Sequence, residues 1–309
     1  MRWLFVGSVL LLFFLARELC GSWLLGFLAA ALFTIRPLAL GFGHSAMLEM
    51  PLVFFCLPGL LVAARYLLKP DVERSAVRRR YVYGAGLLCG IAWSTKLNAL
   101  LVAATIAVWL AYDVLVTGGL RRDTGETVRQ AWLRRVRAQR PLRILGTAAL
   151  TMYIVFFAVN PRVWHQPIRQ PARMLKHGRT IRTYEVSPDL RLDTVGEKVM
   201  EPIEQGLGRS GPLDRWLGWS WGDELLAVLG VVVCVVLVIR WAGRDTRRAH
   251  GFFFVLLWIG VTYFGIVATA PFRWSRWYAL LEPCWAILQA MGIVGLLYGA
   301  AAVIRRRSA

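Results

Sequence analysis

Residues 225–241 read LLAVLGVVVCVVLVIRW, an apolar run whose last two residues are Arg240 and Trp241 and which is followed by further arginines at 244, 247 and 248. A helix needs about 20 mostly apolar residues to cross a bilayer, or somewhat fewer where it is short. This run therefore predicts a membrane span with a basic flank. Comparable apolar runs cover residues 3–16, 20–36, 45–68, 82–94, 98–117, 144–160, 252–270 and 278–304.

The composition of the whole chain agrees with this interpretation. Of the 309 residues, 57% are hydrophobic, and 37 Lys+Arg against 18 Asp+Glu give a formal charge of +19. A disordered chain has few apolar residues, and a soluble nucleic-acid-binding protein needs a polar surface, so both classes are excluded. We expect an all-α polytopic membrane protein, with about nine spans in one transmembrane domain over residues 1–309 and no nucleic-acid partner.

The positions of the arginines predict the orientation, because short cytoplasmic connections are enriched in Lys and Arg. Four connections carry most of the positive charge, namely residues 69–80, 121–143, 240–248 and 305–307. We place these four connections in the cytoplasm. The 160–224 segment is then an extracytoplasmic loop, on the outer side of the cell membrane. Residues 121–143 have the pattern of a basic amphipathic helix on the membrane surface, although a solvated connector fits the same residues.

Polar side chains at the edges of spans are the first candidates for function, because they are costly to bury. Glu49 lies one turn into a span, and His44 precedes it by five residues. Together they could handle a proton or a cation. A salt bridge from Glu49 to Arg36 or Lys96 is the structural alternative. Lys96 interrupts an apolar stretch, where its ammonium could meet a lipid phosphate or extend to the interface.

Two further polar segments lie on the predicted outer side. Asn160 and Pro161 end a span, and Trp164 suits the membrane interface. Arg276 and Tyr278 belong to a cationic and aromatic turn that suits a phosphate or a sugar, and also an interfacial belt. The chain has no Walker loop, dinucleotide-binding fingerprint or nucleophile elbow, so membrane ATPases, dehydrogenases and hydrolases have no support.

These segments, in this order, resemble the GT-C membrane glycosyltransferases of family 39, which include protein O-mannosyltransferases and lipid A aminoarabinose transferases. The matching stretches are GHSAMLEMP at 43–51, GIAWSTK at 90–96, NPRVWHQP at 160–167 and RWYALLEP at 276–283. The resemblance implies transfer of a sugar from a polyprenyl-phosphate carrier to a lipid, glycan or protein acceptor, on the extracytoplasmic side of the cell membrane and among membrane lipids.

The resemblance also implies roles for individual residues. Lys96, Arg276 and Tyr278 match positions at the carrier phosphate, and Glu49 matches the second acidic position. With His44, Glu49 forms the candidate catalytic set. The motif residues Asn160, Pro161 and Trp164 match architectural positions. No cofactor is required by these assignments, a divalent cation is compatible with them, and the metal ligands stay unknown.

The chain departs from the family pattern at its start. Family members carry their first acidic motif in an outer loop after the first span, whereas only Met1 and Arg2 precede the first apolar run here. We therefore expect a chain that lacks the first span and its acidic loop, or a relative without catalysis. A transporter or lipid-handling protein, and a non-catalytic membrane subunit, are the rival functions.

Overall fold

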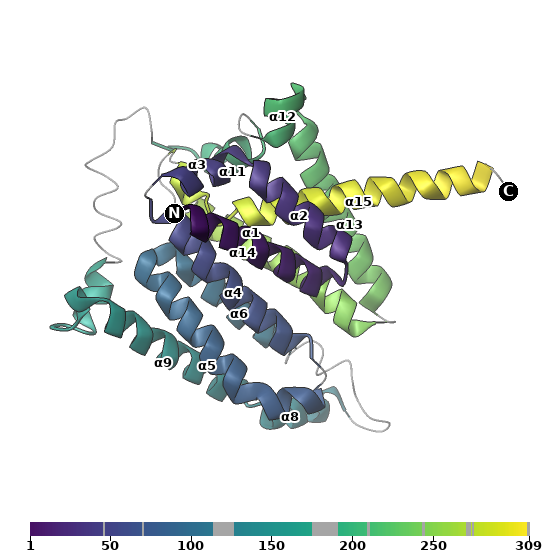
Figure 1. Cartoon of the computed structure of the whole chain (residues 1–309). Coiled ribbons are helices and arrows are strands. Elements are labelled where there is room, and N and C mark those ends of the chain that lie inside the picture. The colour runs from purple at the N-terminus through teal and green to yellow at the C-terminus, as the bar shows by residue number, and fades with distance from the viewer. Residues whose placement is uncertain are drawn as a thin grey trace.

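The structure is a computed structural model that describes residues 1–45, 47–69, 71–113, 127–174, 191–208, 211–242, 245–269, 273 and 275–307. Its long elements are helices gathered in one bundle (Figure 1). Six of them, in the described part, are long and apolar enough to cross a membrane. These are α1 (Arg2–Cys20), α4 (Glu49–Leu67), α9 (Pro141–Val159), α13 (Gly222–Ala242), α14 (Thr246–Thr269) and α15 (Glu282–Arg307). The prediction of an all-α polytopic membrane protein is confirmed.

The predicted count of nine spans is not confirmed. Helix α2 (Trp23–Ile35) and helix α3 (Pro37–His44) form a pair bent by 66°, and they add a seventh span only if the pair counts as one. Predicted span 82–94 is part of α5 (Asp71–Thr95), which begins with a charged segment. Predicted span 98–117 corresponds, in its described part, to η1 (Leu97–Ala99) and α6 (Leu100–Tyr112), a shorter apolar helix.

Glycines allow α5 and α9 to pack closely against each other. A Cβ at Gly90 of α5 would lie 2.6 Å from the carbonyl oxygen of Met152 in α9, and one at Gly86 would lie 2.7 Å from that of Ala148. Spaced four residues apart, these glycines give α5 a small-residue face, the usual device for bringing two membrane helices together. Helix α9 therefore lies directly against the C-terminal half of α5, the half that leads to Lys96.

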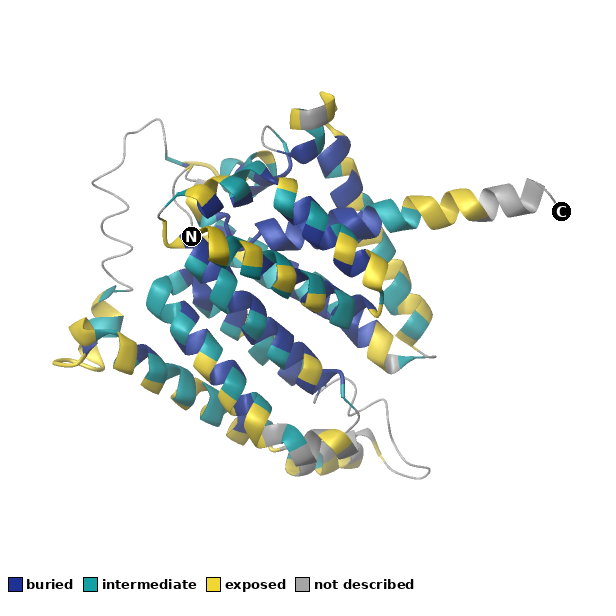
Figure 2. Cartoon of the chain, in the orientation of Figure 1, coloured by how far each residue is buried: buried dark blue, intermediate teal, exposed yellow. Residues whose placement is uncertain are grey.

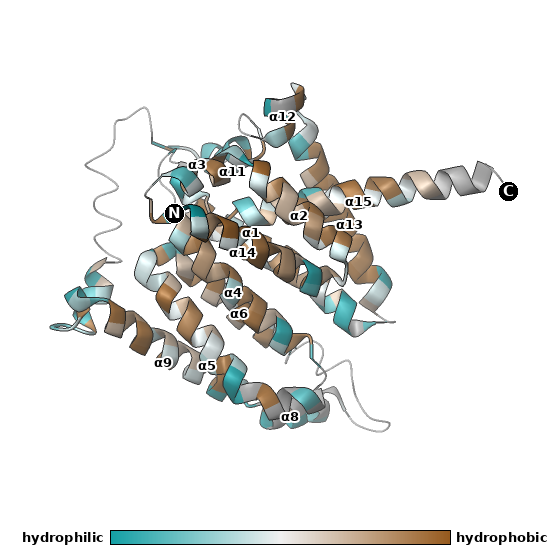
Figure 3. Cartoon of the chain, viewed as in Figure 1, coloured by the Kyte–Doolittle hydropathy of each residue, from teal (hydrophilic) through white to brown (hydrophobic). Residues whose placement is uncertain are grey.

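The outer faces of the bundle are apolar. Helix α13 exposes large hydrophobic side chains along its length, as Figures 2 and 3 show by its yellow and brown segments. They include Val228, Val232, Val235, Val236 and Ile239. Since lipid tails are as apolar as these side chains, such faces are typical of helices that contact the hydrocarbon core.

The bundle has two ends of different character (Figure 1). We call one the α3 end, because α3 lies there with α11 (Val195–Gly206). The other is the α8 end, named for α8 (Val128–Gln139), which a capping box between Thr127 and Gln130 starts. The described residues 127–143 of the predicted basic segment form α8 and the first turn of α9. Residues 121–126 lie outside the described residues.

Candidate active site

Glu49 and Lys96 form an ion pair at the α3 end. Glu49 is the first residue of α4, and Lys96 directly follows α5. The Lys96 Nζ donates to Glu49 Oε1 at 2.9 Å. The carboxylate side chain is 5% exposed and the ammonium side chain 22%. One of the two salt-bridge alternatives for Glu49 is therefore observed, while Arg36 pairs with Glu282 instead.

A third segment, distant in sequence, joins this pair. Lys96 Nζ also donates to the backbone oxygen of Arg276 at 3.2 Å, across 180 residues of sequence. The ammonium lies 5.6 Å from the ring centre of Trp277, within range of a cation–π interaction. Both residues belong to η5 (Ser275–Trp277). The first, second and fourth candidate stretches for chemistry, near residues 49, 96 and 276, thus meet at one place.

A cavity of about 630 Å³ lies beside this meeting point. One wall is α3 and the residues after it, and the other is the turn that holds two arginines. The lining residues are Pro37, Leu38, Gly41, Phe42, Ser45, Met47, Arg273 and Arg276. An apolar wall facing two guanidinium groups suits a ligand with one anionic group and one apolar part.

The burial of Lys96 outweighs the effect of its ion pair on the pKa of the ammonium. The loss of water around the side chain lowers the pKa of the Lys96 ammonium below its ordinary value, more than Glu49 raises it, and the charge of Arg276 lowers it further. An anion bound beside Lys96 would favour the charged ammonium.

The remaining predicted residues lie in different surroundings. His44, the last residue of α3, is exposed, and no hydrogen bond or ion pair joins it to Glu49 in the described structure. Tyr278 is completely buried, and this burial raises the pKa of its hydroxyl above the ordinary value. The structure thus brings together Glu49, Lys96 and the Arg276 backbone, whereas His44 stays at the surface.

The Asn160 motif shapes the end of α9. Asn160 follows the helix and donates from Nδ2 to the carbonyl of Phe156 at 2.9 Å. Pro161 opens η3 (Pro161–Val163), where its missing N–H costs no hydrogen bond. Trp164 is 54% exposed and donates from Nε1 to the carbonyl of Phe157 at 2.8 Å. These contacts are those of a helix terminus and an exposed aromatic side chain.

The sequence interpretation missed the role of α11. Arg273, which lines the cavity, lies 3.1 Å from Glu197 Oε1 and 3.8 Å from Glu201 Oε2 of this helix. The two acids are four residues apart, a spacing that places them on one face of a helix. Nothing in the sequence indicated that their partner is Arg273. Among the described residues, no group of three His, Cys, Asp or Glu side chains could hold a metal ion.

The described helices form a polytopic membrane bundle that holds a carboxylate–ammonium pair and an arginine-lined cavity at one end. The comparison with family models shows the class of membrane protein to which this bundle belongs. The chain belongs to the dolichyl-phosphate-mannose-protein mannosyltransferase family, whose model matches residues 2–165. Among curated proteins and among solved structures, nothing matches the chain.

Membership of this family confirms the resemblance seen in the sequence. The chain is a membrane glycosyltransferase that uses a polyprenyl-phosphate-linked sugar as donor. The matched region contains Glu49, Lys96 and the Asn160 motif, whereas Arg276 and the C-terminal helices lie beyond it.

Proposed function

We propose that the chain transfers a sugar from a polyprenyl-phosphate carrier to a hydroxyl-bearing acceptor at the α3 end. The observation that supports this most directly is the convergence of Glu49, Lys96 and η5 beside the arginine-lined cavity. The family name adds mannose as the sugar and a protein as the acceptor to be tried first.

The proposed reaction needs a positive charge at the leaving phosphate and a carboxylate at the acceptor hydroxyl. The acceptor oxygen forms a bond to the anomeric carbon while the bond from that carbon to the carrier phosphate oxygen breaks, and the phosphate gains negative charge as it leaves. In the proposal, the ammonium of Lys96 and the guanidinium of Arg276 stabilise this charge. The acceptor hydroxyl gives its proton to the carboxylate of Glu49, the residue paired with Lys96.

We place the active side outside the cytoplasm. The α8 end carries Arg129 and Arg137 on α8, with Arg247 and Arg248 at the start of α14. The candidate site lies at the other end of the bundle (Figure 1). Since positive connections stay on the cytoplasmic side, the α3 end faces outward in this proposal.

The test is sugar transfer by the purified chain in nanodiscs. Polyprenyl-phosphate mannose is the donor, and peptides rich in serine and threonine are the acceptors, with polyprenyl-phosphate aminoarabinose and a lipid acceptor as the second pair. We expect Glu49→Gln to reduce turnover about a hundredfold or more, because it keeps the shape of the side chain and removes its charge.

The matched control is Glu18→Gln at the α8 end. Glu18 is also paired with basic residues, Arg65 at 3.7 Å and Arg247 at 3.2 Å, but Arg65 lies in the last turn of α4, whereas Glu49 begins that helix. It should keep its turnover. Full activity of Glu49→Gln would refute the role of this carboxylate. Absence of transfer by the unmodified chain with both donors would favour the transporter or subunit alternatives.

A further inference from the structure

Arg36 occupies the bend between α2 and α3. The following residue, Pro37, disfavours helical backbone at Arg36, which adopts φ −70° and ψ 125°. This extended residue separates the two helices and produces the bend of 66°. Its side chain turns into the bundle and is 1% exposed. The chain therefore buries a full positive charge directly beside the wall of the cavity.

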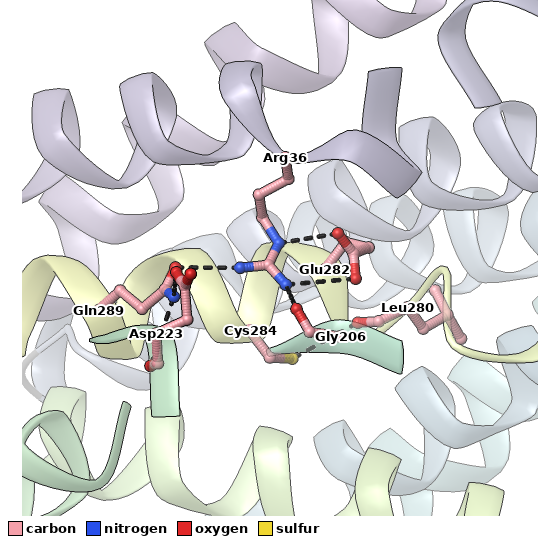
Figure 4. A network of polar contacts seen from close by, with 7 residues as sticks. All are labelled: Arg36, Gly206, Asp223, Leu280, Glu282, Cys284 and Gln289. Carbon is pink, nitrogen blue, oxygen red and sulfur yellow. Dashed lines mark hydrogen bonds and ion pairs between the residues drawn. The ribbon is translucent and has the colours of Figure 1, made fainter. Parts of the chain in front are cut away.

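The guanidinium of Arg36 connects the bend between α2 and α3 to α11 and to α15 (Figure 4). Its Nε donates to Glu282 Oε2 at 2.7 Å, and its Nη1 donates to Gln289 Oε1 at 2.9 Å, both on α15. Its Nη2 donates to the backbone oxygen of Gly206, the last residue of α11. Glu282 is 2% exposed, so the charge pair is sealed from water. All three nitrogens of the planar group thus donate to buried acceptors, and Nη2 also donates to Glu282 Oε1 at 3.4 Å.

The network continues through Gln289. Its Nε2 donates to Oδ1 of Asp223, at the start of α13. The second carboxylate oxygen of Asp223 accepts the backbone N–H of Leu213 at 2.7 Å and that of Asp214 at 3.3 Å, in α12 (Pro212–Leu217). The polar atoms of this network tie the family-matched half of the chain to the C-terminal helices.

The network begins at the residue that directly precedes α3. Residues 37, 38, 41, 42 and 45 form one wall of the cavity, and they begin immediately after Arg36. The opposite wall, at Arg273 and Arg276, is carried by the segment that leads into α15. Arg36 therefore joins the two walls through Glu282, the first residue of α15.

We propose that Arg36 is a positioning residue that holds α3 at the distance from η5 that the donor's phosphate and sugar require. The proposal rests on the proposed function for its substrate, although its geometric part does not. Lysine cannot replace arginine here, because a single ammonium cannot reproduce the planar fork that reaches Glu282, Gln289 and the Gly206 carbonyl together.

A spin-label distance tests the geometric part without substrate. Gly41 on α3 and Gly146 on α9 are suitable label sites, since a Cβ at either meets nothing within 4 Å. The five native cysteines are all buried, so the labels react with the introduced thiols. In the double Gly41→Cys and Gly146→Cys chain, we expect Arg36→Lys to shift or broaden the distance distribution. The matched substitution Arg65→Lys, in the Glu18 pair, should leave it unchanged.

Kinetics of the unlabelled full chain test the consequence for the donor. We expect Arg36→Lys to raise the donor KM about tenfold and change kcat by less than about threefold, whereas Arg65→Lys alters neither. The milder Glu282→Gln variant keeps the hydrogen-bond acceptor and should give a smaller rise in KM. A distance distribution that stays at the unmodified value, or a donor KM that does, would overturn the proposal.

The two proposals can fail separately. If the unmodified chain transfers no sugar, the proposed function fails, and the spin-label distance still decides whether Arg36 positions α3. If the chain transfers sugar and Arg36→Lys only lowers the amount of folded protein, with the donor KM of the folded fraction unchanged, Arg36 is a structural residue and the positioning proposal is refuted.

Discussion

Replacing Lys96 with Met separates its structural role from its role at the carrier phosphate. The substitution keeps a long apolar stem and removes the charge. At 2.9 Å and an effective dielectric constant of 20, the attraction between the two charges is about 6 kcal/mol before desolvation is subtracted. Burial offsets much of this, since it lowers the pKa of Lys96 despite the presence of Glu49. We therefore expect a net loss of about 1–3 kcal/mol in the free energy of unfolding, mostly from the unpaired Glu49.

Carrier binding should fall by a separate amount. A charge-assisted contact to a phosphate is worth about 1.5–3 kcal/mol, which corresponds to about a 10- to 150-fold rise in Kd. The measurement is calorimetric titration of the purified chain with farnesyl phosphate, a short polyprenyl monophosphate. Thermal unfolding of the same samples gives the stability term.

The double variant Lys96→Met with Glu49→Gln supplies the decisive comparison. It removes the unpaired carboxylate, so it should recover most of the lost stability. It should not recover carrier binding, because the ammonium is still missing. Tight farnesyl phosphate binding by Lys96→Met would refute the assignment, and so would a double variant that binds as well as the unmodified chain.

Three other expectations follow from the same structure. The folded chain releases the Lys96 proton at a lower pH than the unfolded chain, because the pKa of Lys96 is lowered. As the pH rises toward the ordinary pKa of lysine, thermal stability should therefore rise and carrier binding should fall. Lys96→Met should show neither trend. Gly90→Ala should lower the free energy of unfolding by about 1–3 kcal/mol, whereas Gly146→Ala, with open space at its Cβ, should not, as measured by thermal unfolding. A membrane-impermeant maleimide added outside intact cells should label Gly196→Cys and not Gln130→Cys, and the reverse labelling would contradict the orientation.

The sequence predicted the fold class well because hydropathy is a local property. The apolar run at 225–241 lies inside α13, and the run at 144–160 corresponds to α9. The span count could not be read as reliably, since α5 combines a charged first half with an apolar second half in one helix. Helix α3 was missed as well. The sequence prediction ended one span at Arg36 and began the next at residue 45, so it left residues 37–44 as a connection where the structure has a helix beyond the bend.

The partners of charged residues were harder to predict than the charges themselves. The sequence offered Arg36 and Lys96 equally as partners for Glu49, because both lie at the same predicted membrane edge. The choice depends on α15, which brings Glu282 to Arg36 from 246 residues away. No periodicity in the sequence records such a contact. The polar network behind the cavity therefore becomes visible only once the helices are packed.

Glu49 can both form an ion pair with Lys96 and take part in the proposed reaction. In the ion pair the carboxylate is the buried member and the ammonium the more exposed one, at 5% and 22%. In the proposed function, a carrier that arrives from the α3 end would therefore meet the cation first, while Glu49 holds Lys96 in place and stays available for the acceptor hydroxyl. An ion pair that served stability alone would gain nothing from leaving the ammonium partly open, since a surface-exposed charge adds little to folding. The asymmetry of the pair thus favours phosphate recognition as the primary task of the site, with proton handling by Glu49 following once the carrier has bound to Lys96.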